Sequence, residues 1–291
     1  NKMTTLSAPI VQVRSLAMSR QGKQLLDDIS FSIHEREVFV LLGANGAGKT
    51  LLIEALAGDT RHSGEIAYRD DIDKSRRTIC YDVFATFPML SVGEVLDFLA
   101  ALYDCERDEA LLRTLKIDEI EKKNFRILSK GERRRLGVYA CLFPKPALAI
   151  LDEPTDGMDP PMRSAFWSLV TQRNCAVLLS THLWDEAQLA HDRIALIGRG
   201  RLLAPPSPAE TLIASVPYAG KVRTSSLPET VTPPVPVTRR EASDDLFYSD
   251  DSEKDRIIAW LKEAGLADKG YSVLPVDLAD VYHILLEQSD D

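Results

Sequence analysis

Short runs of apolar, β-branched residues alternate with helix-period segments along the N-terminal part of the chain. The runs at 10–16, 29–33 and 37–43 predict strands, and the segment 48–58 predicts a helix that Gly58 closes. Strands that alternate with helices are typical of a layered α/β domain. We therefore expect a sheet-based core in this part of the chain.

A block of helix-period segments interrupts this alternation. Residues 91–103 and 107–115 have the apolar spacing of amphipathic helices, and strand patterns return at 147–152 and 175–181. The pattern thus predicts a helical subdomain at about 88–146, inserted into the α/β core. The core itself should contain a mixed sheet.

Prolines divide the chain after a predicted hairpin at 192–204. We place the boundary there, between a large domain at 1–204 and a small α+β domain at 205–291. The proline-rich stretch 227–238 cannot form a central strand, because proline lacks the amide that a sheet requires. Beyond it, the pattern predicts a helix at 253–264, a strand around 271–274 and a helix at 277–287.

Composition narrows the possible partners. The chain has 291 residues, 45% of them hydrophobic, and a net charge of −9, which argues against nucleic acid as a partner. No apolar run reaches the roughly 18 residues that a membrane helix needs, so a membrane role would require a partner protein. Scattered cysteines without C-x-x-C spacing predict reduced, packed thiols in the cytosol: Cys80, Cys105, Cys141 and Cys175.

The sequence GANGAGKT fits the phosphate-binding pattern G-x-x-x-x-G-K-[ST], and it lies between a predicted strand and a predicted helix. In this motif, backbone amides surround phosphates, Lys49 reaches the β- and γ-phosphates, and the Thr50 hydroxyl binds Mg²⁺. We expect a nucleotide at the loop and at the residue after it: Gly43, Ala44, Asn45, Gly46, Ala47, Gly48, Lys49, Thr50 and Leu51.

Two acids end the apolar strand pattern at 147–152. Burying unpaired carboxylates is costly, so Asp152 and Glu153 should have a cation or hydrogen bonds nearby. We expect Asp152 to hold Mg²⁺ and Glu153 to orient and deprotonate the attacking water. The alternative is a solvated strand end that caps a turn.

A single histidine ends the strand pattern at 175–181. A lone histidine is more often structural than functional. Parallel sheets, however, place functional groups at the carboxyl ends of their strands, where His182 would meet Lys49 and Glu153. We therefore include His182 in the predicted site.

The sequence LSKGERRRLG at 128–137 starts a second helix with a Ser-x-Gly turn. Free amides and the helix dipole attract anions there, so the chain has two places for one kind of ligand. The arginines that follow, Arg133, Arg134 and Arg135, resemble a nucleic-acid patch. On an acidic chain we favour a solvated helix face or a subunit contact instead.

Five motifs in this order, GANGAGKT, LSKGE, LAILDEP, DGMD and STH, make residues 10–204 resemble the nucleotide-binding subunits of ABC transporters. The resemblance implies a P-loop NTPase of the ABC type that hydrolyses ATP with Mg²⁺. It also implies an integral-membrane permease and a second ATPase subunit, identical or homologous, as partners. The subunit would lie at the cytoplasmic face of the membrane, held there by the permease.

In this family two subunits form a head-to-tail dimer, and each ATP lies between the phosphate loop of one and the LSKGE turn of the other. The resemblance therefore assigns Ser129, Lys130, Gly131 and Glu132 to the partner's nucleotide. It places Asp159 between the two sites. It also makes His182 a contact for the γ-phosphate.

The chain differs from the family pattern at several positions. No aromatic precedes Phe31 to stack on adenine, and Leu51 stands where a second hydroxyl is common. In the LSKGE turn, Lys130 replaces a glycine and Glu132 replaces the usual glutamine.

The glutamine that usually links Mg²⁺ to the permease is missing too, because none occurs between Gln24 and Gln172. Asp82 is the nearest oxygen-bearing side chain, and it either approaches Mg²⁺ or caps a turn. The loop 82–92 should receive a permease helix, with apolar contacts from Phe84, Phe87 and Met89.

The tail resembles that of exporter-type subunits with a small C-terminal domain, so we expect an exporter ATPase. Two alternatives stay open. An ATP-binding regulatory subunit would hydrolyse little, although intact Glu153 and His182 argue against it. A soluble non-transport ABC ATPase would carry a long coiled coil or a second domain, and the segment between Lys49 and Ser129 sustains no heptads.

Overall fold

The computed structural model describes residues 8–82, 87–189, 192–228, 230–235, 237–239 and 243–289. The chain forms two compact units, Asn1–Ala209 and Glu210–Asp291. The sequence pattern places the division at 204/205, in the loop before helix α7 (Ala209–Ala214). Among the described residues, no helix is long and apolar enough to cross a membrane.

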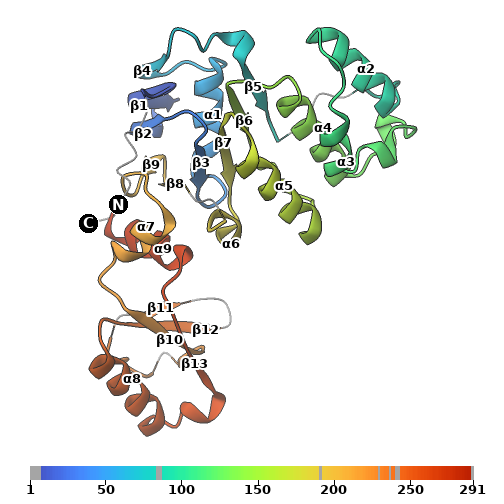
Figure 1. Ribbon diagram of the computed structural model, residues 1–291. Helices are drawn as coiled ribbons and strands as arrows, with labels where there is room; N and C mark the ends of the chain where they lie inside the picture. The colour runs from blue at the N-terminus through green and yellow to red at the C-terminus, as the bar shows by residue number, and fades with distance from the viewer. Residues whose placement is uncertain are drawn as a thin grey trace, which may run out of the picture. The chain divides into compact units, whose positions relative to one another are not determined.

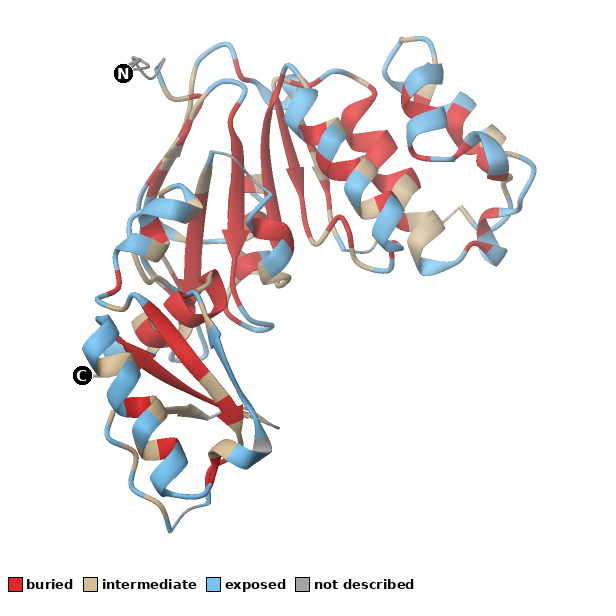
Figure 2. Cartoon of the chain, turned by 60° about the horizontal axis from the view of Figure 1, so that its bottom comes forward, coloured by how far each residue is buried: buried red, intermediate tan, exposed pale blue. Residues whose placement is uncertain are grey.

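A six-stranded sheet forms the centre of the first unit (Figure 1). Its first five strands are parallel, and only the last pair is antiparallel. Every residue of the central strand β3 is buried, and Figure 2 shows the buried middle of this sheet in red. In spatial order the strands are β5 (Arg77–Cys80), β6 (Leu148–Leu151), β7 (Ala176–Thr181), β3 (Val38–Leu42), β8 (Arg193–Gly198) and β9 (Arg201–Leu202).

A separate antiparallel sheet consists of β2 (Lys23–Ile33), β1 (Val11–Arg20) and β4 (Ser63–Tyr68), in that order. The strands predicted at 10–16 and 29–33 are confirmed, but both continue into a long hairpin. Register shifts along β1 break the alternation of apolar and polar residues that a strand prediction needs. For this reason the sequence pattern missed the outer half of the hairpin. It also missed β4 and β5.

Helices occupy the chain between β5 and β6, as the apolar spacing predicted. Both α2 and α4 begin with a capping box, which satisfies two amides at each N-terminus. The helices of the first unit are α1 (Lys49–Ala57), α2 (Val92–Leu102), α3 (Glu109–Thr114), α4 (Lys130–Leu142), α5 (Pro160–Gln172) and α6 (Trp184–Ala187), with 3₁₀ turns η1 (Lys74–Arg76), η2 (Asp118–Ile120) and η3 (Phe125–Ile127).

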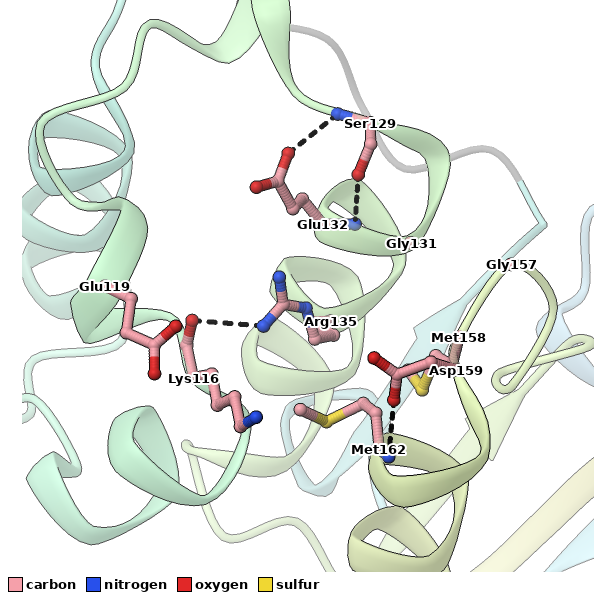
Figure 3. A pocket seen from close by; sticks show the side chains of 10 residues that line it. All are labelled: Lys116, Glu119, Ser129, Gly131, Glu132, Arg135, Gly157, Met158, Asp159 and Met162. Atoms are coloured by element: carbon pink, nitrogen blue, oxygen red, sulfur yellow. Dashed lines mark hydrogen bonds between the residues drawn. The ribbon is translucent and has the colours of Figure 1, made fainter.

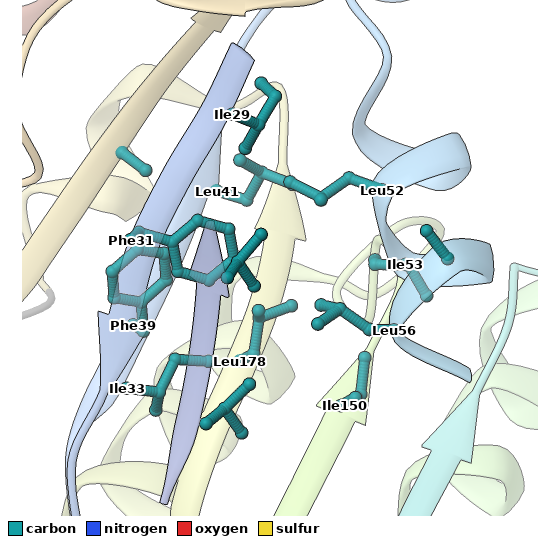
Figure 4. Packing of buried hydrophobic residues seen from close by; sticks show 14 of the residues in the cluster. Ile29, Phe31, Ile33, Phe39, Leu41, Leu52, Ile53, Leu56, Ile150 and Leu178 are labelled. Carbon is teal, nitrogen blue, oxygen red and sulfur yellow. The ribbon is translucent and has the colours of Figure 1, made fainter. Parts of the chain in front are cut away.

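An apolar core joins the two sheets to helix α1 (Figure 4). Phe31 of β2 stacks on Phe39 of β3 with ring centroids 5.0 Å apart. Leu52 and Ile53 of α1 are fully buried in the same cluster. Each such side chain contributes about 1.5–3 kcal/mol of burial free energy, so strand β3 and helix α1 are held firmly at both ends of the loop that joins them.

The second unit is an antiparallel sheet in the order β11-β12-β10-β13, covered by a helix. The predicted helices and the strand at 271–274 are confirmed, whereas β10 and β12 were not predicted. The proline-rich stretch contributes only the edge strand β11, as proline chemistry requires. The elements are β10 (Gly220–Ser225), β11 (Val237–Arg239), β12 (Ser243–Tyr248), α8 (Asp251–Glu263), η4 (Ala267–Lys269), β13 (Tyr271–Leu274) and α9 (Leu278–Gln288). Trp260 packs against the apolar cluster of this unit, as expected.

Candidate functional site

The loop between β3 and α1, residues 43–48, depends on its glycines. A Cβ atom on Gly43 would lie 2.2 Å from the carbonyl oxygen of Ile197, so no larger residue fits there. Gly46 and Gly48 have φ values of 79° and 110°, which L-residues rarely adopt. The loop therefore folds tightly, and the amides of Gly43 and Ala47 donate to the carbonyl oxygens of Thr181 and Ala44.

Helix α1 begins at this loop without a side-chain cap. Gly48 offers no capping atom, and the first turn contains no acidic residue. The first amides of a helix have no partner within the helix, and its dipole attracts negative charge. The start of α1 is thus suited to an external anion such as phosphate.

The Lys49 side chain is buried beneath the loop and is 6% exposed. Its Nζ donates to the carbonyl oxygens of Gly43 at 2.7 Å and Ala44 at 3.2 Å, and it lies 3.2 Å from Oε1 of Glu153. A buried ammonium needs such partners, because an uncompensated buried charge is costly. These contacts hold the lysine next to the phosphate-suited amides.

Asp152 ends strand β6 and is almost fully buried. One carboxylate oxygen accepts a hydrogen bond from Thr50 Oγ1 at 2.9 Å, and the other accepts from Ser180 Oγ at 2.5 Å. Ser180 Oγ also accepts from the amide of Glu153 at 2.9 Å. Ser180 was not among the predicted site residues. Its place in the STH motif, near the end of a predicted strand, could have indicated it.

Glu153 lies between a lysine and a histidine. Its backbone is in the left-handed region, with φ of 48°, which turns the chain sharply at the end of β6. Its Oε1 faces Lys49, and its Oε2 lies 2.8 Å from Nδ1 of His182. The structure thus brings together Lys49, Glu153 and His182, which come from three different elements.

Lys49 and Glu153 border a cavity of about 280 Å³, which we call the loop cavity, whereas His182 is not among its lining residues. Ala47 does not line this cavity, because it packs into the apolar core. Leu51 packs against the same core and also lines the cavity. The lining residues are Asn45, Gly46, Gly48, Lys49, Thr50, Leu51, Asp82, Asp152 and Glu153.

A second cavity, of about 300 Å³, lies at the start of α4, and we call it the signature cavity (Figure 3). Ser129 accepts a hydrogen bond from the amide of Glu132 at 3.2 Å, and Glu132 accepts one from the amide of Ser129 at 2.8 Å. Asp159 caps α5 on the opposite wall, 2.8 Å from the amide of Met162. The lining residues are Lys116, Glu119, Ser129, Gly131, Glu132, Arg135, Gly157, Met158, Asp159 and Met162.

The turn that begins α4 packs closely on the loop after β6. A Cβ atom on Gly131 would lie 2.4 Å from the carbonyl oxygen of Gly157, so glycine is required at this position. Lys130 Nζ lies 2.5 Å from Oδ2 of Asp156, and this contact holds the pKa of the Asp156 carboxyl below its ordinary value. These contacts hold the turn that begins α4 against the loop that follows β6.

Glu132 is held in its ionised form. Burial opposes ionisation, but hydrogen bonds from Lys123, at 2.7 Å, and from Ser129 outweigh it and lower the Glu132 pKa. The glutamate can thus accept from the Ser129 amide and from the lysine at once. An uncharged glutamine would bind the lysine more weakly.

The prediction that the arginine triplet forms a solvated face or a subunit contact is wrong for Arg134. Its side chain is buried, because it donates to the carbonyl oxygens of Tyr81 and Asp152 and to the carboxylate of Asp82. Arg135 donates to the carbonyl oxygens of Leu115 and Lys116. These arginines join elements of one chain, which a helical pattern cannot reveal.

Asp82 is paired with Arg134 while it also lines the loop cavity. Residues 83–86 lie outside the described part of the chain, so the predicted contact at Phe84 does too. Phe87 lies beside Phe98 and Phe125, with ring centroids 5.8 and 5.9 Å away. Met89 is 86% exposed.

The cysteines behave as packed thiols. Cys80, Cys141 and Cys175 are buried and free, and Cys105 is half-buried. Burial raises the pKa of the Cys80 thiol to about 12, so it stays protonated at neutral pH.

Thr50 and Asp152 are the oxygen donors best placed to hold a metal ion. Magnesium commonly takes one or two protein oxygens and completes its shell with water and substrate phosphates. The described residues contain no group of three or more His, Cys, Asp or Glu side chains arranged for a metal ion. One hydroxyl and one carboxylate are a donor set that fits an ion bound together with a phosphate chain.

Comparisons with known proteins agree with this geometry. The ABC transporter family matches residues 26–156. The chain is 31% identical over 212 residues to the uncharacterized ABC transporter ATP-binding protein YhcH of Bacillus subtilis, which covers 67% of this chain and 68% of the relative. This chain belongs to the family of ABC transporter ATP-binding proteins. The ATP-binding domains of this family hydrolyse ATP.

Other relatives of this ATP-binding subunit include one of similar length and one that is much longer. The linearmycin resistance ATP-binding protein LnrL of Bacillus subtilis is 31% identical over 212 residues, 67% of this chain and 68% of the relative. The rat phospholipid-transporting ATPase ABCA3 is 33% identical over 201 residues, and the match spans 64% of this chain but 12% of that protein.

Solved structures confirm the fold. An ATP-binding subunit of an ABC transporter superposes with a TM-score of 0.62 at 22% identity, covering 71% of this chain and 92% of the other. The subunit cbiO1 of Clostridium perfringens, part of the ABC transporter complex cbiONQ, gives 0.58 at 25% identity, covering 72% and 95%. The predicted P-loop ATPase fold of the ABC type is thus confirmed.

Proposed function

We propose that this ATP-binding subunit hydrolyses ATP within a head-to-tail dimer and thereby powers export through a membrane permease. The observation that carries the dimer is that the loop cavity and the signature cavity share no lining residue. Each suits anionic groups at a helix N-terminus. A triphosphate in the loop cavity would leave the signature cavity for the nucleotide of a second subunit.

In the loop cavity, the backbone amides of residues 44–46 and 48 would bind the phosphates, and Lys49 would bind their terminal groups. Thr50 and Asp152 would hold Mg²⁺, which neutralises phosphate charge when bound. Ser180 supports this role, because its hydrogen bond orients the carboxylate of Asp152.

Glu153 is the proposed general base. Lys49 contacts Glu153 Oε1 and two backbone carbonyls. Phosphate oxygens are stronger partners for an ammonium, so nucleotide binding would free Oε1 to accept a water proton. His182 would keep Oε2 in place and contact the γ-phosphate.

The dimer is tested by mixing two inactive chains. Lys49→Ala disables the loop cavity, and Ser129→Arg disables the signature cavity. A mixed dimer would contain one intact composite site, formed by the loop of the Ser129→Arg chain and the signature turn of the Lys49→Ala chain. Recovery of ATP hydrolysis on mixing supports the dimer, whereas activity no higher than the sum of the parts contradicts it.

The direction of transport rests on likeness to relatives. A resistance protein such as LnrL suggests removal of a compound from the cell. We infer an exporter at the cytoplasmic face of the membrane. Transport with the permease in inverted vesicles would show uptake for an exporter, and uptake only in right-side-out vesicles would exclude one.

A further inference from the structure

The guanidinium of Arg134 joins three elements inside one chain. It projects from helix α4, and its side chain is 2% exposed. Its Nη1 donates to the carbonyl oxygen of Tyr81 at 3.1 Å and to that of Asp152 at 3.3 Å, and its Nη2 donates to the carboxylate of Asp82. One side chain therefore bridges the ends of strands β5 and β6.

Two of the residues that Arg134 contacts, Asp82 and Asp152, line the loop cavity. The Asp82 side chain lines that cavity, and the Asp152 carboxylate holds Thr50. A buried arginine needs an anionic partner, and among the described residues Asp82 is the carboxylate with which Arg134 forms an ion pair. The pair also offsets a negative charge that would otherwise face a triphosphate.

The N-terminal end of α4, which carries Arg134, also borders the signature cavity. Helix α4 is continuous from Lys130 to Leu142, and Ser129 caps its first turn. Arg134 therefore lies just over one helical turn after the signature turn. A shift of the Asp82 carboxylate would pull on the helix that presents Ser129 and Gly131.

We propose that Arg134 and Asp82 are a positioning pair that couples the loop cavity of one chain to the signature turn of the same chain. Asp82 borders the loop cavity, and its ion pair with Arg134 fixes the position of α4 relative to that cavity. The pair thus sets how one chain presents its signature turn to the nucleotide of the other. This inference rests on the proposed dimer.

The mixed dimer separates this role from direct contact with the nucleotide or its metal. We place Asp82→Asn in the Lys49→Ala chain, which supplies only the signature turn to the intact site. A residue that acts solely in its own loop cavity would have no effect there, because that cavity is already disabled. A positioning pair would lower hydrolysis at the partner's site.

We expect Asp82→Asn in the signature-donating chain to lower turnover about 3-fold to 10-fold, within the usual range of coupling between sites. Arg134→Gln in the same chain should lower it about 10-fold or more, since it removes a charged hydrogen-bond donor from three acceptors. Asp82→Glu should restore most of the activity. Arg133→Gln is the matched control, because Arg133 lies over the Phe125 ring and contacts neither strand end.

Thermal unfolding of each variant distinguishes positioning from loss of structure. Asp82 is 54% exposed, so Asp82→Asn should melt within a few degrees of the parent chain. Turnover equal to that of the parent mixture, or a loss only when Asp82→Asn is in the loop-donating chain, overturns the positioning pair. If the parent mixture itself recovers no activity, the proposed dimer is wrong and the inference fails with it.

Discussion

The two helix N-termini that face the cavities are built differently. Helix α1 starts at Gly48, with no side-chain cap and no acid in its first turn. Helix α4 starts at Ser129 with a complete capping box to Glu132. Both carry the same helix dipole, so the difference lies in how each helix satisfies the amides of its first turn.

A helix start that caps itself can hold its shape without a ligand, whereas an uncapped start leaves its amides for one. The start of α1 leaves its amides to a ligand, and the buried Lys49 lies beside them. The start of α4 already has protein partners, so the signature turn keeps its shape in an isolated chain. In the proposed dimer, a phosphate from the other subunit would add to the capping box or displace part of it.

The largest effect should come from the base beside the loop cavity. Glu153→Gln removes the proton acceptor but keeps the side-chain volume, so turnover should fall by about 100-fold or more while ATP still binds. Single-turnover hydrolysis and nucleotide binding measure the two effects separately. Asp185→Asn is the control, because this exposed acid lies outside both cavities.

In the mixed dimer, Glu153→Gln should matter only in the chain that supplies the loop. An equal loss from either chain would mean that the two cavities are not separate in function. Near-normal turnover of the variant would exclude Glu153 as the base.

Gly131→Ala tests the signature side. The added Cβ would lie 2.4 Å from the Gly157 carbonyl oxygen, so the turn or the facing loop must shift. We expect hydrolysis by the dimer to fall about 10-fold or more, because small displacements of a binding group weaken catalysis strongly. ATP binding to the isolated chain should be unchanged.

Gly93→Ala is the matched control, since it is also a helical glycine and its nearest contact would be an ordinary 3.5 Å. Loss of ATP binding by Gly131→Ala in the isolated chain would contradict the separation of the cavities.

Ser129→Ala should reveal what the capping box contributes. Loss of a serine cap usually costs about 0.5–2 kcal/mol of unfolding free energy. Urea unfolding of the first unit should show this loss, whereas the glycine-started α1 has no comparable cap to remove. Glu132→Ala should cost a similar amount and add little in the double variant, because both residues belong to one box. If the two losses of unfolding free energy were additive, Ser129 and Glu132 would not act as one capping box.

The loop side should discriminate weakly between purine bases. Phe31 is stacked on Phe39 in the core, so it cannot receive a base. Stacking on an aromatic ring is worth about 1–3 kcal/mol per base, and without it ATP and GTP should bind within about 10-fold of each other. Competition binding measures the ratio. A much stronger preference for ATP would require another group, such as Arg20 or Met18, to contact the base.

The smallest effect concerns the ion pair between Lys130 and Asp156. The folded pKa of Asp156 is lowered, chiefly by the hydrogen bond from Lys130, so the pair stabilises the fold above the ordinary pKa of aspartate. That contribution is lost as the pH falls through the folded pKa. Because Lys130 is largely exposed, it should amount to about 0.5 kcal/mol or less.

Unfolding of Asp156→Asn and of the parent chain between pH 7 and pH 3 should therefore differ slightly at neutral pH and converge in acid. If the difference in unfolding free energy between the two chains grew as the pH fell, the ion pair would not stabilise the fold in the way described.

Most local elements and the positions of the motifs could be predicted from the amino-acid sequence. The apolar run before Gly43, the helix after it and the acids that end β6 are readable because each depends on neighbours along the chain. The same holds for α8 and α9, whose apolar spacing follows one helical face. Strands β4, β5, β10 and β12 were missed, because their partners in the sheets decide whether such short, partly polar segments form strands.

Contacts between residues that are distant in the sequence could be seen only in the folded structure. Arg134 belongs to a helix whose pattern looks solvated, yet it is buried because the ends of β5 and β6 supply acceptors from other parts of the chain. Ser180 gains its role in the same way, from Asp152 on a neighbouring strand. Periodicity reports which face of an element is apolar, whereas a hydrogen bond across the fold depends on which strand ends the topology brings together.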